Sequence, residues 1–252
     1  MNYEIIAHRG FSAIAPENTL AAFREAMAHQ ANSIEFDVQL SSDSVPIIIH
    51  DTTVDRTTNG IGWVRDKTLE ELKALDAGSW FSSHFAGEKI LTFREALRTI
   101  QTLERETLTS LQHLYVEVKE SENWSTTDIA NFLEIIMSEG WQERCIVLCF
   151  NDRFLKRVRQ QSQTIALGYL VHSLAAYTTQ LNLAAADGNA IVLSEYHLLL
   201  NNPSLVASAR TEGVDIVAWT VDTHEDFHKL TTMGIIRIVT NSLVNVPQSS
   251  LD

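Results

Sequence analysis

Short apolar segments alternate with amphipathic segments along most of the chain. In segment 18–30, Leu20, Phe23 and Met27 recur at the spacing of one helix face, and Asn18 is the expected N-cap. Alternation of apolar strands with such helices predicts a parallel β-sheet covered by helices. The expected strands are residues 3–7, 33–39, 114–119, 145–150, 165–171, 190–193, 214–219 and 235–239.

Eight such strand–helix units in 252 residues predict an α/β fold, the closed (β/α)8 or TIM barrel. We expect a single barrel domain over residues 1–252, with a small insertion at approximately 51–92 after the second strand. The insertion is too long for a plain loop, so it is expected to be structured. Thr68 and Glu71 form the capping-box pattern of a short helix within it. The alternative is an open doubly wound sheet, but no glycine-rich phosphate loop follows an expected strand.

Two acidic residues stand among the apolar residues of the second expected strand. Successive side chains of a strand point to opposite faces, so Glu35 and Asp37 share one face and their apolar neighbours share the other. Glu117 and Lys119 repeat this arrangement in strand 114–119. An edge strand with its polar face in water is the alternative interpretation. Charged groups are rarely buried unless they are paired or bind a ligand, so this pattern on two strands favours a functional site.

Further polar residues follow the strands at the end of the barrel where functional sites lie, the carboxyl end. His8 and Arg9 follow the first strand, and His50 ends a short apolar run, 45–50. Arg9 and Lys119 beside acidic groups suit phosphate oxygens, which arginine can bind in bidentate fashion. The two histidines are candidates for an acid and a base near neutral pH.

The three carboxylates indicate a metal site with oxygen ligands. Glu35, Asp37 and Glu117 have no cysteine near them in the expected fold. Such a set suits Mg²⁺ or Ca²⁺, with Mn²⁺ as a further candidate, and does not suit a structural zinc. A metal-free cluster of salt bridges with Arg9 and Lys119 is the alternative.

Composition restricts the partners. The net charge of −13, from 32 acidic and 19 basic residues, repels polyanions, so nucleic acid and anionic membranes are not expected partners. An anionic small-molecule substrate would need local positive groups or a cation at its site. No apolar run approaches the ~20 residues of a membrane span.

Cys145 and Cys149 lie in one expected strand, about 13 Å apart, too far for a disulfide. With no signal-peptide pattern at the start, this predicts a cytoplasmic protein. The oligomeric state is left open.

Six short motifs occur in order along the chain. They are H-R-G-x5-P-E-N-T-x3-F from His8, I-E-F-D-V from Ile34, I-I-I-H-D-x4-R-T-T-x-G-x-G-x-V from Ile47, L-D-A-G-S-W-F from Leu75, V-E-V-K from Val116 and A-W-T-V from Ala218. This ordered set resembles the glycerophosphodiester phosphodiesterase family, over nearly the whole chain and most densely in its first half.

The resemblance implies an enzyme with a (β/α)8 barrel and an insertion after the second strand. It implies hydrolysis of glycerophosphodiesters to sn-glycerol 3-phosphate and an alcohol, with a divalent cation. It also implies that His8 and His50 form the acid–base pair, with His8 as base and His50 as acid. The other positions carried over are Glu35, Asp37 and Glu117 as metal ligands, Arg9 and Lys119 as phosphate-binding residues, and Phe150 and Trp219 as substrate-pocket residues.

Three positions depart from the family pattern. Arg237 replaces a glycine and Asn241 an aspartate near the last strand, and Cys149 replaces a serine at the end of the fourth. None belongs to the metal or histidine set, so the resemblance leaves the shape of the eighth loop and the choice of alcohol open, but not the core chemistry.

Two other functions stay open on the sequence. One is a lysophospholipase D-like phosphodiesterase, with an apolar groove supplied by Trp80 and Phe81 or by the leucines 198–200. The other is a non-catalytic binding barrel.

Overall fold

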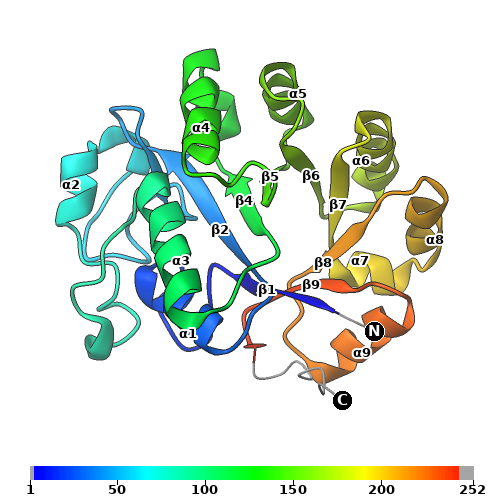
Figure 1. Ribbon diagram of the computed structural model, residues 1–252, viewed down its shortest axis with the longest axis horizontal. Coiled ribbons are helices and arrows are strands. Elements are labelled where there is room, and N and C mark those ends of the chain that lie inside the picture. The colour runs from blue at the N-terminus through cyan, green and yellow to red at the C-terminus, as the bar shows by residue number, and fades with distance from the viewer. Residues whose placement is uncertain (1–2, 244–252) are drawn as a thin grey trace.

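The computed structural model describes residues 3–243 and shows a closed barrel of eight parallel strands with helices around its outside (Figure 1). Strand β1 pairs with both β2 and β9, which closes the sheet. The predicted (β/α)8 architecture is therefore confirmed. The barrel strands are β1 Glu4–His8, β2 Ser33–Leu40, β4 Leu114–Val118, β5 Cys145–Cys149, β6 Ala166–Val171, β7 Ala190–Glu195, β8 Ile216–Trp219 and β9 Arg237–Thr240.

Most of the α-helices in residues 3–243 begin at a polar residue whose side chain accepts a hydrogen bond from a free backbone N–H group. Thr68 and Thr92 start α2 and α3 with capping boxes, as the sequence predicted for Thr68. No helix in residues 3–243 combines the length and the apolar character needed to cross a membrane. The α-helices are α1 Leu20–Ala28, α2 Leu69–Ala74, α3 Phe93–Thr107, α4 Thr126–Ser138, α5 Asp152–Gln161, α6 Leu174–Asp187, α7 Tyr196–Asn201, α8 Ser204–Thr211 and α9 His224–Thr232. Short 3-10 turns are Val64–Asp66, Ser83–Phe85 and Ser121–Asn123.

Strand β2 presents two chemically different faces. Ile34, Phe36 and Val38 join the large apolar core between the strands and the surrounding helices. Glu35 and Asp37 take the alternate positions and are also buried, because those positions face the barrel interior. β2 pairs with β1 on one side and β4 on the other, so the edge-strand interpretation is wrong. Its register places Glu35 beside His8 and Asp37 beside Glu117.

The insertion after β2 is structured, as predicted. It follows β3 (Pro46–Ile48), which pairs antiparallel with β2 and is no part of the barrel. Val54, Val64, Leu72 and Ile90 form a small apolar core with the β3 segment. Figure 1 shows α2 at one side of the molecule, outside the ring of helices that surrounds the barrel. The insertion thus covers one side of β2 and carries its own packing.

A second buried cluster of charged and polar groups closes the opposite, amino-terminal end of the barrel. Oε1 of Glu4 accepts hydrogen bonds from Ser33 Oγ (2.6 Å), His113 Nδ1 (2.8 Å) and Tyr115 Oη (3.0 Å). Oε2 of Glu4 lies 3.1 Å from Nε of Arg237, one of the departures from the family pattern. Arg237 therefore supports the base of the barrel and lies away from the loops at the carboxyl end.

Replacement of Glu4 by glutamine is expected to lower the free energy of unfolding by about 2–3 kcal/mol at neutral pH, because Arg237 and three donors lose a buried anion. Burial raises the pKa of Glu4, but the bonds from His113 and Ser33 and the charge of Arg237 lower it by more. The group's contribution is therefore full above the unfolded pKa of about 4.3 and is lost as the pH falls through the lower folded value.

Urea unfolding of the wild type and of Glu4→Gln at pH 7 and at pH 3 measures this difference. Glu25→Gln, which alters an exposed ion pair with His29, is the matched control and is expected to change little. A difference between wild type and Glu4→Gln that stays constant over this pH range contradicts the assignment.

Candidate active site

Three carboxylates converge at the carboxyl end of β2 and β4. One oxygen from each of Glu35, Asp37 and Glu117 lies within 4.8 Å of the others, so the group could hold a metal ion. Glu35 and Asp37 are buried, and 12% of the Glu117 side chain is exposed. The parallel pairing of β2 and β4 brings them together although β4 lies far along the chain.

Two cations lie among these carboxylates. Lys119 Nζ is 2.5 Å from Glu117 Oε1 and 3.1 Å from Asp37 Oδ1. Arg9 Nε is 3.2 Å from Asp37 Oδ2, and the backbone N–H of Arg9 donates to Glu35 Oε2 at 3.0 Å. The contacts of Arg9 Nε and of Asp37 Oδ1 are ion pairs without hydrogen-bond geometry, so both buried atoms lack a hydrogen-bond partner.

The pKa values of the three carboxylates are shifted in different directions by their surroundings. Burial opposes the ionisation of Asp37, but the charges of Lys119 and Arg9 hold its pKa below the ordinary value. Burial, together with the charges of Asp37 and Glu117, raises the pKa of Glu35 well above the ordinary value. The pKa of Glu117 is also raised, chiefly by burial. Two cations therefore do not neutralise the three acids, and additional positive charge is favourable here.

Asn18 joins the acidic cluster, which the sequence analysis did not predict. Its Nδ2 donates to Asp37 Oδ2 at 2.9 Å, and its Oδ1 accepts from the Asp37 backbone N–H at 3.3 Å. The N-cap of α1 is instead Thr19, which accepts from Ala22 N–H, so the N-cap prediction for Asn18 was wrong. The left-handed backbone at Asn18 (φ 60°) turns its side chain toward β2. Its place within the P-E-N-T motif was the available signal.

His8 ends β1 and lies beside the acidic cluster. Its Nδ1 is 2.7 Å from Asn241 Oδ1, and its Nε2 is 3.8 Å from Glu35 Oε2. Burial, followed by the charge of Arg9, lowers the pKa of His8 to about 4. The imidazole is consequently neutral at neutral pH.

His50 is held by a chain of ion pairs that reaches Arg9. Its Nδ1 is 2.7 Å from Asp51 Oδ1, and Arg56 contacts both oxygens of Asp51 at 2.6 and 2.9 Å. Arg56 also donates to Glu17, which accepts from Arg9 NH1 at 2.8 Å. Burial is the largest cause of the lowered pKa of His50. Through Asp51 and Arg56, the insertion therefore links His50 to Glu17 and Arg9.

One cavity of about 220 Å³ at the mouth of the barrel contains most of the predicted site residues. Its polar side is formed by His8, Arg9, Glu35, His50, Glu117 and Lys119, and its apolar side by Leu148, Phe150, Leu170, Leu193, Trp219 and Val239. Asp37 lies beneath this surface, fully buried. The rings of Phe150 and Trp219 meet edge to face, with centroids 6.0 Å apart. The cavity therefore offers charged groups on one wall and apolar surface on the other.

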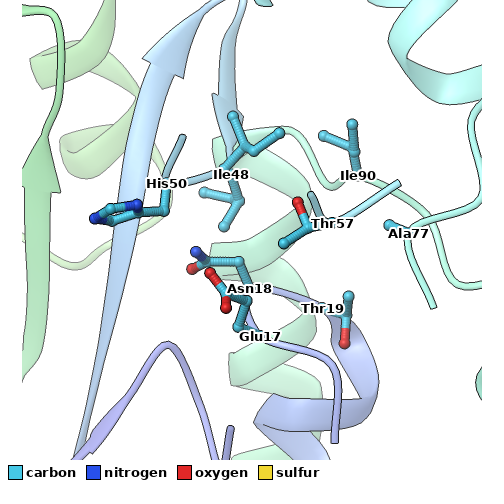
Figure 2. Close-up of a pocket in the computed structure, with 9 residues that line it drawn as sticks. Glu17, Asn18, Thr19, Ile48, His50, Thr57, Ala77 and Ile90 are labelled. Carbon is cyan, nitrogen blue, oxygen red and sulfur yellow. The ribbon is translucent and has the colours of Figure 1, made fainter. Parts of the chain in front are cut away.

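A second hollow behind His50 is much smaller, about 10 Å³, which is space for one water molecule. Figure 2 shows Asn18, Thr57 and Ile90 around it and the imidazole of His50 pointing away from Thr57 and Ile90. Its size excludes it as a substrate site.

The segments considered for an apolar groove do not line the cavity. Residues 198–200 belong to α7, a helix that the sequence analysis did not predict, in which Leu199 is fully buried. Glu195 starts this helix by accepting from Leu198 N–H. Trp80 packs against Phe81 and donates to Ala77 O. Neither segment supplies surface next to the acidic cluster.

Comparison with known proteins gives a consistent result. Residues 8–244 match the profile of the glycerophosphoryl diester phosphodiesterase family. A glycerophosphodiester phosphodiesterase of Caldanaerobacter subterraneus is 36% identical, with 96% of each chain covered. A solved phosphodiesterase of Oleispira antarctica, in complex with the product sn-glycerol-3-phosphate, superposes with a TM-score of 0.84 at 30% identity and covers 94% of this chain and 92% of its own. A glycerophosphodiester phosphodiesterase of Agrobacterium tumefaciens, 24% identical with a TM-score of 0.80, shares the fold, covering 96% of this chain and 97% of its own.

Proposed function

Because this chain belongs to the glycerophosphoryl diester phosphodiesterase family and is a phosphoric diester hydrolase, we propose that it cleaves glycerophosphodiesters with two histidines and a divalent cation. The products are sn-glycerol 3-phosphate and an alcohol. The observation that carries the proposal is the single cavity in which both histidines, two of the three acids and both cations meet an apolar wall. We also propose that the whole chain forms one catalytic domain, with residues 51–92 as its insertion.

The acidic cluster fits a hard divalent cation. All the atoms that could coordinate the ion are carboxylate oxygens, and they lie within 4.8 Å of one another. One of these carboxylates, Asp37, has a buried oxygen, Oδ1, that accepts no hydrogen bond. Burial, followed by the charges of neighbouring carboxylates, raises the pKa values of Glu35 and Glu117, and a bound cation would favour their ionised forms. Oxygen ligands suit Mg²⁺, Ca²⁺ or Mn²⁺. When bound, the ion would supply Lewis-acid activation and a template for the phosphate group.

The two histidines divide the proton transfers. His8, neutral because its pKa is lowered to about 4, takes the proton of the nucleophile, which is either water or the C2 hydroxyl of the glycerol group. In the second case departure of the alcohol leaves a cyclic phosphate, which water then opens to sn-glycerol 3-phosphate. His50 protonates the leaving alkoxide. Its pKa is lowered overall, chiefly by burial, but the charge of Asp37 and the contact of its Nδ1 with Asp51 act in the opposite direction and favour the charged form that an acid requires. The histidines line one cavity from β1 and from the loop after β3, which suits groups that act on opposite sides of a phosphorus atom.

The remaining side chains bind the substrate. Arg9 and Lys119 line the polar wall of the cavity, where their positive charges attract the phosphate oxygens of the substrate. Phe150 and Trp219 form the apolar wall, against which the carbon skeleton of the glycerol group packs and displaces water. The buried, free thiols of Cys145 and Cys149 support a reducing, cytoplasmic location.

Hydrolysis of glycerophosphocholine by the purified protein, with Mg²⁺, Ca²⁺ or Mn²⁺ added separately, tests the proposed function. Release of sn-glycerol 3-phosphate is the expected result. Lysophosphatidylcholine is the comparison substrate and is expected to react more slowly, because neither candidate groove segment lines the cavity. Absence of turnover of any glycerophosphodiester with all three ions would instead indicate a non-catalytic barrel.

A further inference from the structure

Asn241 connects His8 to a carboxylate on a different loop. Its Oδ1 lies 2.7 Å from His8 Nδ1 and accepts from Ser12 Oγ at 3.0 Å. Its Nδ2 donates to Asp222 Oδ2 at 2.7 Å, and its backbone N–H donates to Asp222 Oδ1 at 2.7 Å. Asp222 lies just beyond β8 and Asn241 just beyond β9, so two barrel loops meet at this contact.

The orientation of the Asn241 amide follows from its partners. A side-chain amide has a donor end and an acceptor end, and which end faces which neighbour is decided by the hydrogen-bond network. The carboxylate of Asp222 offers only acceptors, so the NH2 end must face it. The carbonyl end then faces His8 and Ser12, and the hydroxyl of Ser12 can donate to it.

The orientation of the amide in turn determines the tautomer of His8. Because Asn241 Oδ1 can only accept, the proton of the neutral imidazole must be on Nδ1. Nε2 then carries the free lone pair, and it is the nitrogen on the side of Glu35 and the cavity. With the amide reversed, Nδ1 would face a donor, the proton would move to Nε2, and His8 could accept nothing there.

We propose that Asp222 and Asn241 are positioning residues that hold His8 as the Nδ1–H tautomer, with its basic nitrogen toward the substrate. The inference rests on the proposed role of His8 as base. His50 is held differently, through direct contact of its Nδ1 with the carboxylate of Asp51. In this chain the His8 side therefore uses an amide relay, at a position where the family pattern has an aspartate.

Replacement of Asp222 by asparagine is the decisive variant, because it changes donors and acceptors while keeping the shape. The carbonyl of the new amide must still accept from Thr240 Oγ1 and from the Asn241 backbone N–H. Its NH2 end then faces Asn241, which has to reverse and present its own NH2 end to His8. We expect the proton of His8 to move to Nε2 and kcat to fall about 10–100-fold with little change in KM.

The double variant Asp222→Asn/Asn241→Asp exchanges the two groups and restores the chain of donors. The amide at position 222 donates to the new carboxylate at position 241, which accepts from His8 Nδ1–H. We expect kcat and the tautomer to return close to the wild type. Thr240→Val is the matched control, since it removes a hydrogen bond to the same Asp222 carboxylate but leaves the Asn241 contact intact.

Nitrogen-15 spectra of the imidazoles report the protonated nitrogen directly, and His8→Gln identifies the His8 signals. The proposal is overturned if the wild type carries the His8 proton on Nε2, which can be measured even if a variant fails to fold. It is also overturned if Asp222→Asn keeps the Nδ1–H tautomer, or if the double variant stays as slow as the single one. A wild type with the Nδ1–H tautomer but no turnover would refute the proposed function alone.

Discussion

Replacement of His50 by alanine is expected to lower kcat for glycerophosphocholine about 10²–10⁴-fold, the usual cost of losing a general acid or base. The side chain of His50 is 32% exposed, so the variant is expected to fold normally. KM should change little, because in our proposal the phosphate group is bound by Arg9 and Lys119 and not by His50. Steady-state kinetics at saturating metal measure both constants.

A substrate with a good leaving group separates the two histidines. A glycerophosphodiester of p-nitrophenol releases an anion that needs no proton, so His50→Ala should be nearly as fast on it as the wild type. His8→Ala should be slow on both substrates, because activation of the nucleophile is still required. Equal losses on both substrates for His50→Ala would contradict its assignment as the acid.

His197 provides a matched control for these variants. Its Nδ1 contacts the carboxylate of Glu195 at 2.7 Å, as that of His50 contacts Asp51, but it lies in α7 outside the cavity. His197→Ala should therefore keep the wild-type kcat. A similar loss in this variant would show that removal of such a pair acts through general destabilisation.

Replacement of Glu117 by glutamine is expected to abolish metal-dependent stabilisation along with most of the activity. An ion present at 100 times its dissociation constant stabilises the folded state by about 2.7 kcal/mol. The variant removes one of three carboxylates from the proposed site and leaves Lys119 beside Asp37. Calorimetric titration with Mg²⁺, Ca²⁺ and Mn²⁺, and unfolding with and without each ion, measure the effect without relying on turnover.

Glu195→Gln is the control for the metal experiment, since Glu195 also ends a barrel strand but is not in the acidic cluster. It should bind the ion as the wild type does. Unchanged affinity in Glu117→Gln, or a wild type that neither binds an ion nor loses activity with a chelator, would favour a metal-free cluster of salt bridges. In that case Lys119 and Arg9 would be the permanent counterions of Asp37.

Several predictions that rest on local patterns agree with the structure. The acids of β2 face inward because alternation along a strand is a property of the backbone, independent of the rest of the chain. The capping box at Thr68 and the rhythm of strands and helices are local in the same sense. The ordered motifs also identified the family, which the comparisons confirm.

Local rules failed where a distant group competes for a side chain. Asn18 has a side chain typical of an N-cap, yet its amide forms hydrogen bonds with both the carboxylate and the backbone of Asp37 on strand β2. The capping rule considers only the following helical turn and cannot detect this contact with β2. The N-cap is the next residue, Thr19.

Helix α7 was missed because its short apolar run has no helical periodicity to detect.

By itself, the sequence determined the barrel, the inward face of the acids and the set of candidate site residues. Only the tertiary structure decided their partners: which cations lie against Asp37, how Arg56 joins His50 to Glu17, and which atom of Asn241 faces His8. These contacts join residues up to 233 positions apart. Their geometry depends on how the barrel closes, since β1 meets β9 only in the completed sheet.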